Sequence, residues 1–270
     1  RRVPAMLSTC MLTTHPLLRL QAIMPLSLVL GAVGCSSTPA ASSRAPASSP
    51  ATSTVAAARV ITSDALPWQA LNPARGDKSP KAANLWGDLR QESATGFLVQ
   101  FVDGFSSPPL VHNITYRGIV IEGVVFNDDA DAERVWMKPG SYWVQPAGDV
   151  HITAALGVGS AYIEIESGPY LVRPPEQAFQ SEDKIINIQA DAIPWKAEAG
   201  VESVRPWGPG GVPRTLLKLP AGFTGTLRAD GLVGVVMVQG AAAGPAALSP
   251  GSFFEVKGGS LALRRDSATP

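Results

Sequence analysis

Short apolar runs alternate with turn residues along most of the chain, and this pattern predicts β-strands. The runs 97–101, 119–125, 141–145 and 161–165 are rich in aromatic and β-branched residues and are bounded by Gly, Pro, Asn and Asp. No long stretch has helical periodicity, and residues 129–135 would form one turn at most. Many short strands joined by such turns are typical of a sandwich or a jelly roll, so we predict an all-β fold.

The same sequence pattern occurs twice, which predicts a duplicated domain. Five segments recur in the same order at an offset of roughly 110–130 residues: 64–68 with 191–195, 85–87 with 206–208, 96–105 with 213–223, 118–123 with 234–240 and 139–143 with 250–254. This period is too long for a solenoid repeat. We therefore predict two units, 59–180 and 181–270. Four tryptophans fall at equivalent places in the two units and are expected to pack in the core or between the units: Trp68, Trp86, Trp195 and Trp207.

Composition and charge exclude several functional classes. The 270 residues suffice for two domains, 45% of them are apolar, and 22 basic residues balance 22 acidic ones. Without a basic run, we expect no nucleic-acid partner. The chain also contains no G-x-S-x-G, P-loop, HExxH or CxxC motif, so serine hydrolase, P-loop nucleotide-binding, zincin and thiol-redox chemistries are not supported.

The first 58 residues have the composition of a targeting segment and a tether. Residues 20–34 are almost wholly apolar, and this run of about 15 residues suits a secretory signal better than the ~20 residues of a spanning helix. Residues 32–35 (AVGC) resemble a bacterial lipobox, so we predict that a signal peptide, 1–34, is removed and that Cys35 is lipidated. Residues 35–58, mostly Ser, Ala, Pro and Thr, form the predicted disordered tether. These features predict a periplasmic lipoprotein, anchored through Cys35 to the outer membrane.

The candidate chemistry centres on the two histidines beyond this segment. His151 ends the spacing G-x5-P-x-G-x2-H, which begins at Gly140 and includes Pro146 and Gly148. Upstream, Gly104, His112 and Gly123 match the spacing G-x5-H-x-H-x3-E-x6-G, in which Leu110 stands at the first histidine position and Tyr116 at the glutamate position.

These two motifs resemble those of the cupin superfamily, the RmlC-like jelly rolls. The resemblance implies tandem double-stranded β-helix barrels, a bicupin. Segments 108–118, 145–153 and 168–171 further resemble an uncharacterised bacterial cupin-like family, known as a domain of unknown function and related to ChrR-type cupins. Those relatives imply a metal in the barrel. The family brings no settled activity with it.

Strand alternation places Leu110, His112 and Tyr116 on one face, because residues two apart in a strand point the same way. His112 and His151 are the candidate ligands of a divalent metal, Zn, Fe or Mn, with Tyr116 as the candidate third ligand. Trp143 and Gln145, together with Leu110 and Tyr116, are the candidate pocket residues. A pocket without metal and a purely structural role of the histidines are the alternatives. The second unit has no histidine, so we expect it to be structural.

Two functional hypotheses follow. The first is an exported, lipid-anchored module that binds or senses a small molecule in the first barrel, through a weakly held metal or without one. The alternative is a metal-dependent cupin enzyme, a dioxygenase or isomerase acting on a small polar compound. The sequence does not decide whether the chain is catalytic. Pairing of edge strands into a homodimer is a further expectation from the cupin resemblance.

Overall fold

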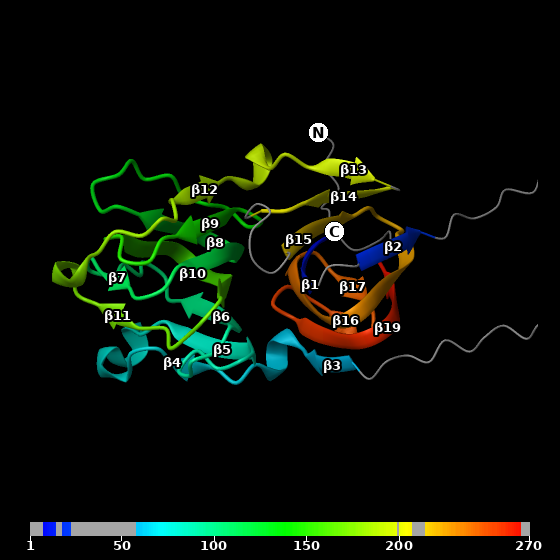
Figure 1. Ribbon diagram of the computed structural model, residues 1–270, viewed down its shortest axis with the longest axis horizontal. Helices are drawn as coiled ribbons and strands as arrows, with labels where there is room; N and C mark the ends of the chain where they lie inside the picture. The colour runs from blue at the N-terminus through cyan, green and yellow to red at the C-terminus, as the bar shows by residue number, and fades with distance from the viewer. Residues whose placement is uncertain (1–7, 15–17, 23–57, 199, 207–213, 266–270) are drawn as a thin grey trace, which may run out of the picture.

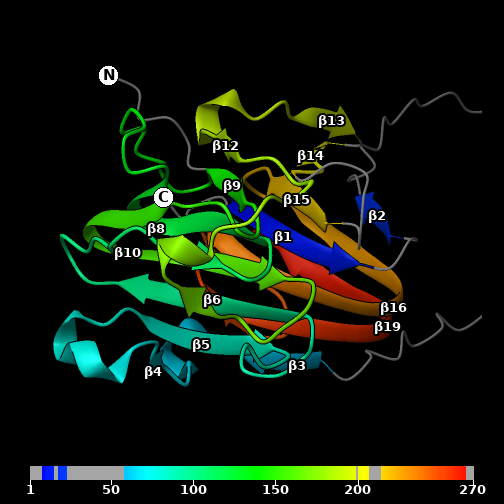
Figure 2. The same ribbon diagram turned by 60° about the vertical axis from the view of Figure 1, so that its left-hand side comes forward.

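The computed structural model describes residues 8–14, 18–22, 58–198, 200–206 and 214–265. Its strands form two large antiparallel sheets and one two-stranded sheet, and each large sheet curls around its own core (Figures 1 and 2). This confirms the prediction of an all-β chain built from two jelly-roll units. The helices in the described part are short 3-10 turns: η1 (Ser63–Ala65), η2 (Pro73–Lys78), η3 (Pro175–Gln177) and η4 (Ala190–Ala192). None of them is long and apolar enough to cross a membrane.

The first barrel contains a seven-stranded sheet in the order β12-β9-β8-β10-β6-β5-β4. Its members are β4 (Gln69–Ala70), β5 (Lys81–Trp86), β6 (Thr95–Phe101), β8 (Tyr116–Asp128), β9 (Tyr142–Gln145), β10 (Ile152–Ile165) and β12 (Ile186–Ile188). A small sheet of β7 (Val111–His112) and β11 (Val172–Arg173) lies at the end of this barrel that faces away from the second (Figure 1).

The second barrel contains a ten-stranded sheet, with β13-β14-β15-β1-β16-β19-β17-β18 in line, β2 beside β16 and β3 beside β19. Its members are β1 (Ser8–Thr14), β2 (Leu18–Ala22), β3 (Ala58–Ile61), β13 (Lys196–Glu198), β14 (Val201–Val204), β15 (Arg214–Leu219), β16 (Thr224–Gln239), β17 (Ala242–Ala243), β18 (Ala247–Leu248) and β19 (Phe253–Arg264).

The two units exchange strands, which corrects the predicted boundaries 59–180 and 181–270. Strand β3 precedes the first barrel in the chain but pairs with β19 of the second. Strand β12 follows position 180 but pairs with β9 of the first sheet. The repeat in the sequence marks where similar segments recur. It does not reveal which sheet edge each connecting strand joins, because that choice depends on tertiary contacts.

The predicted leader, residues 1–34, is not wholly outside the fold. Strand β1 lies between β15 and β16 and pairs with both, and β2 pairs with β16. Residues 8–14 (STCMLTT) combine β-branched and apolar residues, which suits a strand. The positions of these strands correct the expectation that the folded part begins near residue 59. Cys35 and its lipidation lie outside the described residues, and so does most of the tether 35–58.

The sequence repeat corresponds to a turn that occurs in both barrels, at Gly140 and at Gly251. Gly140 and Gly251 both have positive φ, 87° and 84°, a conformation that favours glycine. The Gly140 N–H donates to Val120 O at 2.8 Å, and the Gly251 N–H donates to Met237 O at 2.8 Å. The serine that follows each glycine is fully buried. The duplication inferred from the sequence therefore extends to individual hydrogen bonds.

Each barrel has its own apolar core, and a third cluster joins them. Phe97, Val120 and Ile163 belong to the first core, whereas Val235 and Phe254 belong to the second. The joining cluster contains residues of both units, including Tyr142, Tyr162, Leu216 and Phe253, and Trp68, Trp86 and Trp195 pack against it. This confirms the packing role expected for these three tryptophans. Trp207 lies outside the described residues.

Candidate functional site

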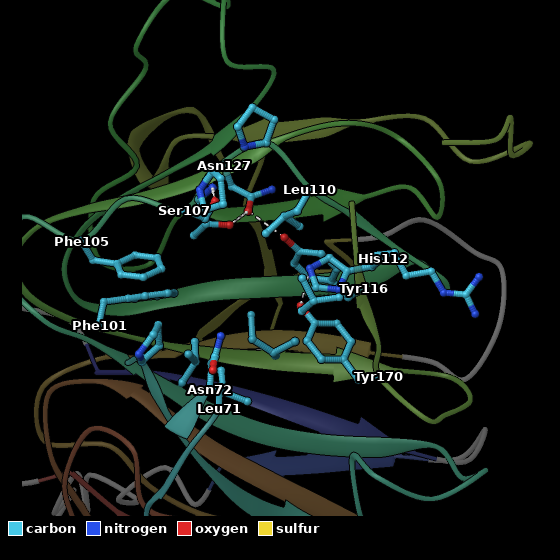
Figure 3. Close-up of a pocket in the computed structure, with 18 of the residues that line it drawn as sticks. Leu71, Asn72, Phe101, Phe105, Ser107, Leu110, His112, Tyr116, Asn127 and Tyr170 are labelled. Atoms are coloured by element: carbon cyan, nitrogen blue, oxygen red, sulfur yellow. Dashed lines mark hydrogen bonds between the residues drawn. The ribbon is translucent and has the colours of Figure 1, made fainter. Parts of the chain in front are cut away.

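A cavity of about 710 Å³ opens in the first barrel (Figure 3). Phe101 and Phe105 lie on one side of it, and His112, Tyr116 and Tyr170 lie on the other. Aromatic and aliphatic side chains provide most of its inner wall, and its polar lining residues include Asn72, Arg75, Ser107, His112, Tyr116, Asn127, Thr153, Tyr170, Arg173 and Glu176. A cavity of this size, apolar with a few convergent polar groups, has the character of a small-molecule site.

Backbone and tyrosine contacts hold the His112 imidazole at the wall of the cavity. Its Nδ1 lies 3.1 Å from the carbonyl oxygen of Leu171, and its Nε2 lies 3.0 Å from the Tyr170 hydroxyl. Because a carbonyl oxygen only accepts, Nδ1 carries the proton and Nε2 accepts the Tyr170 O–H. The Tyr170 ring stacks on the imidazole with 4.2 Å between ring centroids. Burial, followed by the charge of nearby His151, lowers the pKa of His112 to about 3.

The His151 imidazole is likewise held between a backbone carbonyl and a tyrosine hydroxyl, and it is fully buried. Its backbone pairs with Leu110 through two hydrogen bonds of 3.0 Å. Its Nδ1–H donates to Asp149 O at 2.9 Å, which leaves Nε2 as an acceptor facing the Tyr116 hydroxyl at 3.2 Å. Burial lowers the pKa of His151 to about 4. Both imidazoles are therefore neutral near pH 7, and their ring centroids are 5.3 Å apart.

Tyr116 connects His151 to a network of neutral side chains. Its hydroxyl lies 2.7 Å from Asn127 Oδ1 and 3.2 Å from His151 Nε2, so one proton serves two acceptors. Thr153 donates to the same Asn127 oxygen at 2.8 Å, and Asn127 Nδ2 donates to Gln145 Oε1 at 2.8 Å. Burial raises the pKa of Tyr116 and of Tyr170 above the ordinary value, so both hydroxyls stay protonated.

The structure brings most of the predicted site residues together. Leu110, His112, Tyr116 and Trp143 all line the cavity. His151 does not line it, but lies directly behind Tyr116 and is fully buried. The prediction that Gln145 lines the pocket is wrong: its side chain is fully buried behind Asn127 and hydrogen-bonds to it. Alternation along a strand predicts which face of the sheet a side chain lies on. It does not predict whether that side chain reaches the cavity or is covered by another residue, as Gln145 is by Asn127.

Sequence reasoning missed Tyr170 and Asn127. Tyr170 lies in the segment 168–171, which carried the family likeness but offered no ligand spacing. Asn127 belongs to a run that reads as a turn, Asn-Asp-Asp, yet it lies within β8, next to its last residue, with its side chain buried. A register shift in the pairing of β8 with β10, near Gly123, changes which alternate residues face inward. Tyr116 and Asn127 consequently share a face although they are an odd number of residues apart.

The donor set does not fit a resident divalent metal. The residues that the structure describes contain no group of three or more His, Cys, Asp or Glu that could hold one. Leu110 occupies the position where the motif has its first histidine. Both Nε2 atoms already accept a tyrosine O–H, and the raised pKa of Tyr116 opposes the phenolate that a third ligand requires. The predicted site at His112, His151 and Tyr116 therefore has two imidazole donors and no carboxylate.

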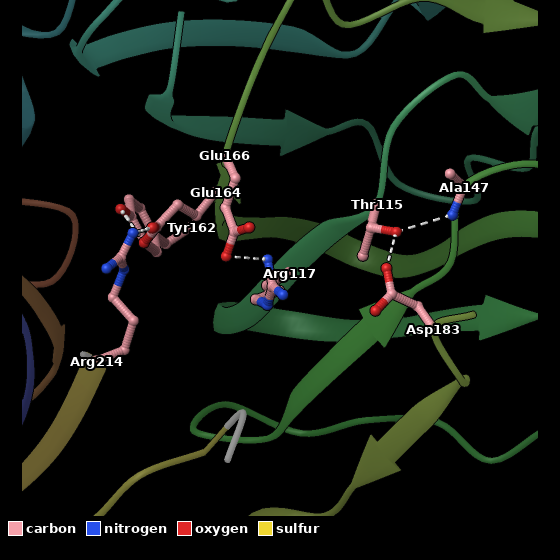
Figure 4. A network of polar contacts seen from close by, with 8 residues as sticks. All are labelled: Thr115, Arg117, Ala147, Tyr162, Glu164, Glu166, Asp183 and Arg214. Atoms are coloured by element: carbon pink, nitrogen blue, oxygen red, sulfur yellow. Dashed lines mark hydrogen bonds and ion pairs between the residues drawn. The ribbon is translucent and has the colours of Figure 1, made fainter. Parts of the chain in front are cut away.

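Glu164 and Glu166 form ion pairs away from the two histidines (Figure 4). Glu164 on β10 forms a buried ion pair with Arg214 of β15 and accepts a hydrogen bond from Tyr162 at 3.1 Å. Glu166 pairs with Arg117 at 3.0 Å. The Glu164 pair therefore joins the two barrels, and neither carboxylate reaches the histidines.

Comparison with known proteins supports this assignment of the fold. A family model described as a domain of unknown function, DUF4437, matches residues 59–264. The chain belongs to this family. The DUF4437 match spans both barrels, which confirms the resemblance to an uncharacterised cupin-like family. No curated protein matches the chain.

Solved structures with the same fold are distant in sequence. One is a candidate dioxygenase from Nostoc punctiforme PCC 73102, with a TM-score of 0.52 and 13% identity over 77% of this chain and 83% of that one. Another is the bacterial pirin YhhW from Escherichia coli, in complex with nickel(II), with a TM-score of 0.48 and 12% identity over 79% and 96%. At 13% identity the likeness to the first of these structures shows the fold and does not transfer a reaction.

Proposed function

We propose that the first barrel of this DUF4437 chain is a binding module for a small organic molecule. The observation that carries the proposal is a roomy, mostly apolar cavity whose buried polar groups are all neutral. His112, which lines the cavity, has a pKa of about 3, His151, which lies behind Tyr116, has a pKa of about 4, and the two tyrosines of the lining have raised pKa values. Such groups recognise a ligand through hydrogen bonds and shape.

The same values count against proton-transfer catalysis. A general base works best when its pKa lies near the operating pH, and these imidazoles lie far below it. A tyrosine with a raised pKa is likewise a poor proton donor. The alternative, a metal-dependent dioxygenase or isomerase, requires a metal that the donor set at His112 and His151 holds with two protein ligands only.

A screen by thermal shift tests the binding function. Leu110 is half-exposed and lines the cavity, so Leu110→Trp places an indole inside it. Leu171 is 39% exposed and does not line the cavity, so Leu171→Trp is the matched control. We expect small molecules that raise the Tm of the wild-type chain to lose their effect in Leu110→Trp and to keep it in Leu171→Trp. Equal shifts in the two variants, or no saturable ligand for the wild type, would contradict the proposal.

Elemental analysis tests the alternative function. Purified without a metal-binding tag and incubated with zinc, iron or manganese, the protein is expected to retain well under one equivalent of metal after desalting. Stoichiometric metal that disappears in His151→Ala would favour the metal-dependent enzyme. His151→Ala must retain the β-sheet circular dichroism of the wild type for that comparison to count.

A further inference from the structure

The cavity lining includes charged side chains, and these give the cavity a preference for ligands of one charge that its neutral polar groups do not give. The lining contains two arginines, Arg75 and Arg173, and one acidic residue, Glu176. The histidine and tyrosines that line it are neutral, as argued above, so the lining has one positive charge in excess near pH 7. Glu176 lies exposed on η3, whereas both arginines are partly buried.

The two arginines differ in their contacts within the protein. Arg75 lies over the Phe105 ring, 5.1 Å from its centroid, and its Nη2 donates to Ser106 O at 3.4 Å. Arg173 on β11 has no ion pair or hydrogen bond from its side chain within the part of the chain that the structure describes. Its strand pairs with β7, where Arg173 lies opposite Val111, the residue next to His112. A half-buried guanidinium without a protein partner at a cavity wall is suited to an anion from outside.

Trp143 adds an apolar side chain to the same cavity. It is 1% exposed and lines the cavity, and its Nε1–H makes no hydrogen bond within the described residues. The indole is close enough to the Tyr116 hydroxyl to lower the pKa of that tyrosine. Because the Nε1 atom is covered by protein, a ligand in the cavity does not reach this N–H.

Most of the cavity wall is apolar. Phe97, Val99, Phe101 and Ile163 belong to this wall, and a cavity of about 710 Å³ holds a ring with a side chain. We propose that the cavity takes a small carboxylic acid with an aromatic or alicyclic body, and that Arg173 binds its carboxylate. This assignment rests on the binding function proposed above and adds the chemical class of the ligand.

Matched acids and amides test the charge preference. The probes are phenylacetate with phenylacetamide and 3-phenylpropionate with 3-phenylpropionamide, titrated into the full chain and followed by ligand-observed NMR. Each pair keeps its shape and differs in charge. We expect each acid to bind at least about tenfold more tightly than its amide, since a charge-assisted hydrogen bond is stronger than a neutral one.

Two arginine variants show whether Arg173 is the cause. Arg173→Gln is expected to remove the preference for the acid and to leave the amide affinity unchanged. Arg90→Gln, an exposed arginine outside this cavity, is the control and should retain the preference. Equal affinities in the wild type, or a preference that survives in Arg173→Gln, would overturn the assignment.

The outcome separates this assignment from the binding function itself. If the amides, or uncharged hits of the thermal-shift screen, occupy the cavity as well as the acids do, the binding function stands and the carboxylate assignment fails. If neither acids nor amides bind and the screen also yields nothing blocked by Leu110→Trp, both proposals fail.

Discussion

The two barrels share a backbone pattern but differ in what fills them. In the first, Tyr116 pairs across the sheet with Gln145, and Gly118 pairs with Trp143. At the corresponding register of the second, Val233 pairs with Val256, and Val235 pairs with Phe254. A polar pair and a glycine–indole pair in one barrel thus become aliphatic and aromatic pairs in the other. The first barrel holds the cavity described above, and the corresponding inward positions of the second belong to a cluster of buried apolar side chains.

The glycine explains how the indole fits. A Cβ on Gly118 would clash with the benzene ring of Trp143, so the indole lies flat over the glycine. Val235 stands at this position in the second barrel, where the smaller Phe254 leaves room for it. The duplicated frame therefore accommodates two kinds of inward side chains, with polar and aromatic residues at the cavity of the first barrel and apolar residues at the same positions of the second.

Loss of the N-terminal strand is expected to have the largest effect, confined to the second barrel. A chain beginning at residue 35, as the predicted removal of a leader would produce, lacks β1 and β2 and leaves β15 and β16 with unpaired edges. Strand β1 pairs at six positions with β15 and at six with β16, and β2 pairs at five positions with β16. At about 1 kcal/mol for each hydrogen bond of these ladders, the loss is on the order of the stability of a whole domain. Hydrogen exchange should show protection lost in β15, β16 and β19 and retained in β6, β8 and β10.

The same experiment tests whether the predicted cleavage before Cys35 is compatible with the fold. Equal protection of both barrels in residues 35–270 would show that the second barrel folds without β1, and the lipoprotein prediction would then be compatible with an intact fold. Loss of the second barrel would mean that cleavage before Cys35 and the structure described here exclude each other.

Truncation of Trp143 and of Phe254, which lie at corresponding positions of the two barrels, is expected to lower the free energy of unfolding by different amounts. Phe254 is fully buried among apolar side chains, so Phe254→Ala should lower the free energy of unfolding by about 3–5 kcal/mol. Trp143→Ala should cost about half as much, because its indole already borders a cavity and the new space merges with it. Urea unfolding measures both. Equal costs would indicate that the first barrel closes around Trp143 and that the cavity does not exist in solution.

Some features of the two barrels could be predicted from the sequence and others could not. The repeat and the two motifs predicted the jelly rolls and the meeting of His112, His151 and Tyr116, because spacing along strands controls these features. Tyr170 and Arg173 come from a connecting segment whose path no periodicity indicates. The exchange of β3 and β12 and the insertion of β1 depend on which sheet edges are open, a tertiary property that local pattern does not contain.

The smallest effect is a dependence of stability on pH that comes from the two buried histidines of the first barrel. His112 and His151 have folded pKa values of about 3 and about 4 against an ordinary 6.5. Between these values the unfolded chain binds more protons than the folded one, so the free energy of unfolding is greatest above pH 6.5 and falls as the pH falls.

One pH unit below 6.5, the expected loss is about 1.4 kcal/mol for each imidazole, roughly 2–3 kcal/mol together. Urea unfolding at pH 7.5, 6.5 and 5.5 measures it, and a His112→Asn, His151→Asn double variant should show a flatter profile at a lower overall stability. NMR titration gives the decisive check, since imidazole midpoints near 6.5 in the folded protein would mean that water reaches both rings. The neutral state of the buried polar groups, on which the binding proposal rests, would then be wrong.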